Sequence, residues 1–199
     1  MNLTRGFAFV SRVLAGRARC LPALLLAGAA VVPASADSPG LTKVGHPIVV
    51  TVDVAEDFSL FNPTLVKPTD TEPKRGSFFV TEGNIYPAGT ISGDGATFDP
   101  NAPGAVGKWF CRGTHLVSAS EIPAAPLWVN TAQLYLFPDD RRSVATEGIE
   151  GGGTVTRVVT GATGELRGYV GEQRQEFLGF NASGGVNLRV TFVLKKAAN

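Results

Sequence analysis

The sequence predicts an all-β protein, a single closed antiparallel β-barrel of about eight strands. Apolar and polar residues alternate from Ile48 to Ala55 and, more clearly, from Val186 to Lys195, with the period of two that a strand requires. Segments rich in Gly, Pro, Asn and Asp separate the other apolar stretches and are typical of turns. After residue 36 no segment sustains the 3.6-residue apolar spacing of a surface helix, so we expect few helices.

The first 36 residues have the pattern of a cleavable secretory signal peptide. Four arginines and no acidic residue accompany an apolar run from Leu21 to Val32, which is followed by Ala34-Ser35-Ala36. The alternative, a membrane anchor, is disfavoured because the run is too short to span a bilayer. We therefore expect cleavage after Ala36, a lead-in at 37–46 and a secreted or periplasmic protein without stable membrane insertion.

The remaining chain is expected to fold as one domain, residues 47–199. Cleavage removes four arginines and no acid, so the formal net charge falls from +1 to −3. This balance gives no support to binding of nucleic acid or of an anionic membrane. Cys111 becomes the only cysteine, which rules out an intrachain disulfide.

Eight strands follow from the alternation and the turn residues within this domain. The segment at about 58–75 contains three prolines and little periodicity, and it is expected to form a long loop with room for one helical turn. Periodicity alone leaves a barrel and a sandwich open, although a barrel removes exposed sheet edges. The expected strands are near 48–55, 77–85, 105–118, 127–137, 142–150, 154–160, 167–178 and 186–195.

The glycine-rich stretch from Val158 to Gly171 is expected to be a crowded corner between two strands. Glycine tolerates positive φ and close backbone approach, which such a corner needs. A phosphate-binding loop is the alternative. We reject it because the stretch lacks a Gly-Lys-Ser/Thr ending and the helix whose N-terminal amides would hold a phosphate.

Three motifs, in order, resemble the allene oxide cyclase and dirigent superfamily. They are Gly107-Lys108-Trp109-Phe110-Cys111, the aromatic-rich stretch Trp128 to Phe137, and Val159-Thr160-Gly161-Ala162-Thr163-Gly164. The resemblance covers roughly Val49 to Lys195. It implies an eight-stranded barrel that assembles as a homotrimer, with a cavity cysteine at Cys111 and an aromatic cavity residue at Trp128.

The resemblance also implies a cavity glutamate, for which Glu56 on the first strand is the candidate. Glu150 is a second carboxylate that could stabilise positive charge in such a site. The sequence departs from the superfamily at Ala162, Leu166 and Tyr169, and the cavity tyrosine of the cyclases has no counterpart near Glu150. These departures put the specific plant cyclase reaction in doubt while leaving the barrel intact.

Strand geometry alone also predicts which residues of this site share a face. On an extended strand Trp109, Cys111 and His115 share one face. Cys111 and His115 are roughly 13 Å apart at strand rise, too far for a thiolate–imidazole pair. Trp109, Cys111 and Trp128 could form a soft apolar wall for a hydrophobic ligand, the alternative being that all three are ordinary core.

Two functions from different classes follow. One is an isomerase or cyclase, or a stereochemical template, that holds a flexible hydrophobic molecule while Glu56 or Glu150 stabilises positive charge. The other is a non-catalytic secreted barrel that binds a ligand or serves a structural role. The two histidines lie far apart without clustered cysteines or carboxylates, so we expect no metal, and no cofactor is expected.

Overall fold

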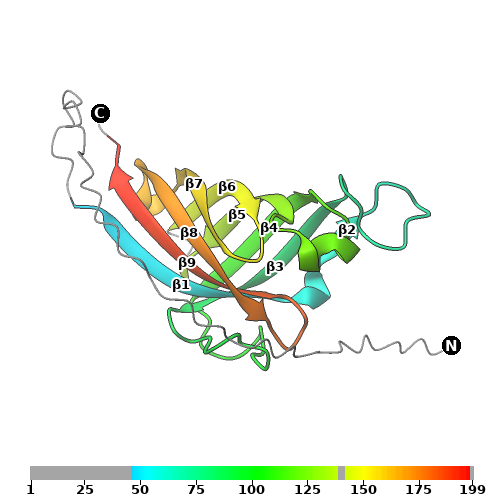
Figure 1. Ribbon diagram of the computed structural model, residues 1–199. Helices are drawn as coiled ribbons and strands as arrows, with labels where there is room; N and C mark the ends of the chain where they lie inside the picture. Colours follow the sequence, from blue (N-terminus) through cyan, green and yellow to red (C-terminus); the bar gives the residue numbers. More distant parts are fainter. Residues whose placement is uncertain (1–45, 139–141, 198–199) are drawn as a thin grey trace, which may run out of the picture. The chain divides into compact units, whose positions relative to one another are not determined.

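The computed structural model describes residues 46–138 and 142–197, which form an antiparallel β-barrel (Figure 1). The predicted signal peptide, its cleavage site and most of the 37–46 lead-in lie outside the described residues. The strands are β1 (Ile48–Glu56), β2 (Asn62–Thr64), β3 (Phe78–Pro87), β4 (Gly107–His115), β5 (Val129–Leu136), β6 (Ser143–Glu150), β7 (Thr154–Ala162), β8 (Tyr169–Phe180) and β9 (Val186–Lys196).

Eight of these strands close into a barrel, and the three-residue β2 pairs with the first residues of β3 in the same sheet. The sheet order is β1-β9-β8-β7-β6-β5-β4-β3-β2, and β1 also pairs with β3, where Val54 lies opposite Ile85. This pairing closes the ring and confirms the predicted all-β barrel of eight strands. Since four steps separate β1 from β6 in either direction around the ring, these two strands are opposite walls.

The period of two directs alternate side chains into the barrel, and the interior has two kinds of wall. The β9 wall is apolar, with Leu188, Val190 and Phe192 fully buried. Polar side chains point inward from β5, β6, β7 and β8. The buried members of this polar wall are Thr131, Gln133, Thr146, Glu150, Arg157, Gln173 and Gln175.

Two short 3₁₀ helices lie at one end of the barrel, η1 (Phe58–Leu60) and η2 (Ala119–Ala124) (Figure 1). Strand β4 ends at His115, three residues before the end of the strand expected at 105–118. The Leu116 amide still donates to the Trp128 carbonyl oxygen at 2.9 Å, one more bond of the β4–β5 ladder, and the chain then leaves the sheet for η2. The Glu121 side chain accepts from the Ser118 amide at 2.7 Å and so caps η2.

The long β3–β4 connection covers the outer face of β1. The Ile91 amide donates to Asp53 Oδ2 at 2.9 Å, and Arg189 Nε donates to Asp53 Oδ1 at 2.9 Å. Tyr86, Ile91 and Ala55 form a small buried cluster beneath this connection. The last five residues of β1 are therefore buried on both faces, and Glu56 is placed firmly at the end of the strand.

The glycine-rich corner joins β7 to β8 through the three-residue 3₁₀ turn η4 (Gly164–Leu166). Gly164 and Gly168 have φ values of 61° and 79°, a left-handed conformation that favours glycine. A Cβ on Gly171 would lie 2.1 Å from the Val193 carbonyl oxygen, so β8 and β9 approach each other closely there. Among the described residues, no helix is both long enough and apolar enough to cross a membrane.

Candidate functional site

A cavity of about 300 Å³ lies at the end of the barrel where η1 and η2 are found. Phe58 of η1 and Ile122 of η2 contribute to its rim, and strands from both kinds of wall contribute to its interior. This volume is at the lower limit of small-molecule pockets. All five residues singled out in the sequence line it: Glu56, Trp109, Cys111, Trp128 and Glu150.

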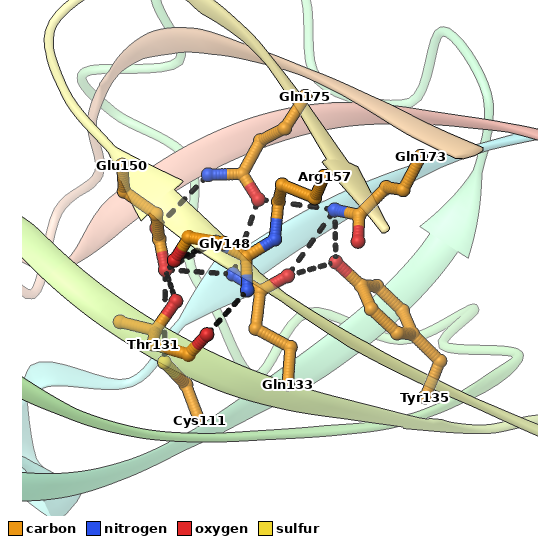
Figure 2. A network of polar contacts seen from close by, with 9 residues as sticks. All are labelled: Cys111, Thr131, Gln133, Tyr135, Gly148, Glu150, Arg157, Gln173 and Gln175. Carbon is orange, nitrogen blue, oxygen red and sulfur yellow. Dashed lines mark hydrogen bonds and ion pairs between the residues drawn. The ribbon is translucent and has the colours of Figure 1, made fainter. Parts of the chain in front are cut away.

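Glu150, the last residue of β6, is held by a dense set of donors (Figure 2). Its Oε1 accepts hydrogen bonds from the Thr131 hydroxyl and from Gln133 Nε2, the latter at 2.9 Å. Its Oε2 accepts from Gln175 Nε2 at 2.9 Å. Side-chain donors from β5 and β8 therefore occupy both oxygens of Glu150.

Arg157 of β7 supplies the opposite charge. Its Nη1 lies 3.4 Å from Glu150 Oε1, and its side chain is fully buried. The guanidinium also donates to the carbonyl oxygens of Gly148 and Thr131, at 3.2 and 3.0 Å. A buried cation needs such partners because the interior does not solvate it.

Gly148 creates the space for Arg157. A Cβ at Gly148 would lie 3.0 Å from Arg157 Cγ and 3.1 Å from its Cβ. The arginine side chain therefore packs directly against the β6 backbone and reaches Glu150 from behind, away from the cavity.

The polar network extends from Glu150 down the polar wall to Tyr135 (Figure 2). Gln133 Nε2 also lies 3.1 Å from Gln175 Oε1, and the Tyr135 hydroxyl donates to Gln133 Oε1 at 2.5 Å. Gln173 Nε2 donates to the Tyr135 hydroxyl oxygen at 2.8 Å. Burial raises the pKa of Tyr135 well above its usual value, so the phenol stays neutral and remains a donor.

Glu56 faces the same cavity from β1, on the opposite wall. Its Oε1 accepts from the Thr81 hydroxyl at 2.7 Å, and its Oε2 accepts from the Val186 amide at 2.9 Å. Both partners are neutral. Burial raises the pKa of Glu56, the two hydrogen bonds oppose that shift, and the charge of Glu150 adds to it.

Cys111 contacts Glu150, and its thiol is a poor nucleophile. Its Sγ donates to Glu150 Oε1 at 3.9 Å. Burial raises the pKa of the Cys111 thiol well above its usual value, and the nearby Glu150 charge raises it further. Because only a thiolate is a strong nucleophile, Cys111 acts here as an apolar wall and a weak donor.

The aromatic residues define the shape of the cavity. Trp109 is buried on β4, and its Nε1 has no hydrogen-bond partner among the described residues. Trp128 lies just before β5, donates from Nε1 to the Ala125 carbonyl oxygen at 2.9 Å and packs edge-on against Phe177.

His115 is buried beside Phe79 and also lines the cavity. Burial lowers the pKa of His115, so its imidazole is neutral near pH 7. Within residues 46–138 and 142–197, no group of three His, Cys, Asp or Glu side chains is close enough to hold a metal ion.

The sequence did not reveal Arg157 or the three glutamines of the network. Arginine and glutamine are mostly surface residues, so their inward position on β5, β7 and β8 could not be expected from composition. One signal was present. Gln133, Gln173 and Gln175 occupy alternate positions of predicted strands, where apolar residues would normally face a core.

Comparison with known proteins identifies the fold. No family model and no curated protein match the sequence. Among solved structures, the pterocarpan synthase dirigent protein PsPTS1 matches 79% of this chain and 100% of its own, with a TM-score of 0.58 and 10% identity. A second pterocarpan synthase dirigent protein, GePTS1, matches 82% and 97%, with a TM-score of 0.54 and 12% identity.

Pyocyanin demethylase is a third structural match, over 74% of this chain and 99% of its own, with a TM-score of 0.50 and 13% identity. At such identities the likeness concerns the fold alone. These matches confirm the predicted fold, a barrel like that of the dirigent proteins.

Proposed function

We propose that this protein binds a hydrophobic small molecule in the barrel cavity and converts it by isomerisation or cyclisation. The observation that carries the proposal is the placement of two carboxyl groups on opposite walls of one aromatic cavity. The names of the dirigent neighbours show that barrels of this shape can host synthases of small molecules.

The two carboxyl groups suit different parts of such a reaction. Glu150, balanced by Arg157 and fixed by three further donors, offers a preorganised negative charge to a substrate that develops positive charge. Glu56, whose pKa is raised by burial, lies on the opposite wall, where its carboxyl group can exchange a proton with the substrate. The aromatic walls would hold a flexible substrate in one productive shape.

A non-catalytic binding protein is the second candidate, and one observation favours it. Both oxygens of Glu150 already accept hydrogen bonds from the protein, so a ligand must compete with Thr131, Gln133 and Gln175 for them. A carboxylate so fully engaged can be a structural element of a ligand-binding barrel.

Native mass spectrometry of protein purified from its own source tests both candidates. We expect a co-purifying hydrophobic compound. Incubation of that compound with the protein, followed by chiral chromatography, should yield a rearranged product of the same mass, and Glu56→Gln should slow its formation. Recovery of the compound unchanged would support the binding function and exclude catalysis. Purification with no compound across several conditions would exclude both.

Export and homotrimer assembly are part of the proposal. Half-exposed apolar side chains, among them Val80, Leu134 and Val158, lie on the outside of β3, β5 and β7, and a shallow hollow covers much of this face. Such a face is suited to burial against a second copy. Sedimentation should give a trimer and Leu134→Glu a monomer, while mass analysis of the exported protein should give an N-terminus at Asp37.

A further inference from the structure

The ionisable residues that line the cavity carry no positive charge. They are Glu56 and Glu150, with Cys111 and His115 both neutral near pH 7. No lysine or arginine among the described residues contributes to the lining. Among the described residues, the cation that contacts a cavity carboxyl group is Arg157. It lies on the side of Glu150 away from the cavity and donates to backbone carbonyl oxygens.

The rest of the lining is dominated by aromatic rings. An aromatic ring presents a negative electrostatic potential from its face, and a cation close to the face is stabilised, most strongly where water is excluded. An anion in the same place would lose its hydration and face both the rings and the carboxyl groups. The aromatic lining residues are Phe58, Phe61, Phe79, Trp109, Trp128, Phe177 and Phe180.

Within residues 46–138 and 142–197, no cation is paired with Glu56, the second carboxyl group of the cavity. Glu150 is paired with Arg157, whereas the contacts of Glu56 are the Thr81 hydroxyl and the Val186 amide. The charged groups that act on Glu56 most strongly besides its own burial are Glu150 and Asp57, and both are acidic. A ligand could therefore supply the missing counter-ion.

We propose that the natural ligand of this cavity is an aromatic organic cation, with its rings against the aromatic wall and its positive charge beside Glu56. This inference rests on the proposed small-molecule function and names the ligand class. Binding of such a cation favours the ionised form of Glu56, so a proton leaves the carboxyl group to solvent as the ligand enters. The affinity for the cation then rises with pH until Glu56 is ionised in the free protein.

Three probes of similar size and different charge test the proposal by titration calorimetry near pH 7. They are N-methylquinolinium, a permanent cation, quinoline, which is uncharged, and 2-naphthoate, an anion. We expect N-methylquinolinium to bind at least about tenfold more tightly than 2-naphthoate, with quinoline between them. The affinity of N-methylquinolinium should increase with pH, and that of quinoline should not change between pH 6 and 8.

Two matched variants locate the effect. Glu56→Gln should weaken the binding of N-methylquinolinium and remove the pH dependence of that binding. It should leave the binding of quinoline unchanged. Glu82→Gln removes a carboxyl group that is exposed on β3 and should change nothing. The ranking of the three probes is measured on the unmodified protein, so it decides the proposal even if Glu56→Gln folds poorly.

The outcomes separate the inference from the function on which it rests. If 2-naphthoate binds as tightly as N-methylquinolinium, the cation preference is wrong while binding of aromatic small molecules stands. If quinoline binds and the cation does not, the result is the same. If none of the three binds, both the cation preference and an aromatic ligand for this cavity are excluded.

Discussion

Glu150 and Glu56 face one cavity from opposite walls, yet their surroundings differ in kind. Glu150 stands in a polar network with a buried arginine and side-chain donors from β5 and β8. Glu56 stands at the edge of the apolar wall with two neutral donors. One barrel thus places a buried cation beside one carboxyl group and only neutral donors beside the other, and burial raises the pKa of the second, Glu56.

Replacement of Arg157, the cation that only Glu150 has, should have the largest effect on stability. Arg157→Met leaves Glu150 buried without a cation and should lower the free energy of unfolding by about 3–5 kcal/mol, as seen when one partner of a buried ion pair is lost. Urea denaturation measures it. Arg174→Met, an exposed position on β8, is the control and should cost less than about 0.5 kcal/mol.

A double variant sharpens the same prediction. Adding Glu150→Gln to Arg157→Met removes the uncompensated charge and should recover part of the loss, so the two changes are not additive. Equal stability of Arg157→Met and the unmodified protein would mean that the pair contributes nothing and that Glu150 is held by its other donors.

Crowding at Gly148 should have an intermediate effect. Gly148→Ala places a Cβ at 3.0–3.3 Å from three atoms of Arg157 and should cost about 1–3 kcal/mol because Arg157 must shift away from Glu150. Gly161→Ala on β7 is the matched control, since nothing lies within 4 Å of its added Cβ. Thermal unfolding of the two variants compares them, and similar melting temperatures would contradict the close packing at Gly148.

Replacement of Glu56 should have the smallest effect, and one that depends on pH. The raised pKa of Glu56 in the folded state means that its ionisation opposes folding. Its contribution to stability is complete below the pKa of the unfolded chain and is lost as pH rises through the higher folded pKa.

Glu56→Gln removes this dependence. Gln is a close match in shape, and its amide can donate to Thr81 while its oxygen accepts from Val186. The unmodified protein should therefore lose stability relative to Glu56→Gln as pH rises from the ordinary pKa of a glutamate through the higher folded pKa of Glu56. Denaturant titrations at several pH values measure the difference. A difference that stays constant with pH would place the pKa of Glu56 at its usual value.

Much of the barrel could be predicted from local pattern. Alternation in strands such as Val186 to Lys195 shows which side chains share a face, and β9 buries Leu188, Val190, Phe192 and Leu194 on one face as that alternation predicts. Trp109 and Cys111 are two residues apart on one strand, so their shared orientation also follows from the sequence. The short β2 was not expected, because three residues with a proline carry too weak a signal.

The candidate site could be predicted only in part. The five residues named from the sequence line one cavity, whereas Arg157 was not among them. The position of Glu56 in the cavity depends on the register of β1, which is set by pairing with β3 and β9 at distant positions in the chain.

The eight strands, the inward faces of the clearly alternating strands and the glycine corner followed from the sequence, because they depend on neighbouring residues and on a period of two. The folded barrel was needed to show that Glu56 and Glu150 line one cavity from opposite walls, and that Arg157 is paired with Glu150. The physical reason is closure of the ring. Pairing β1 with β3 sets the register around the barrel, and that register decides which inward side chains meet.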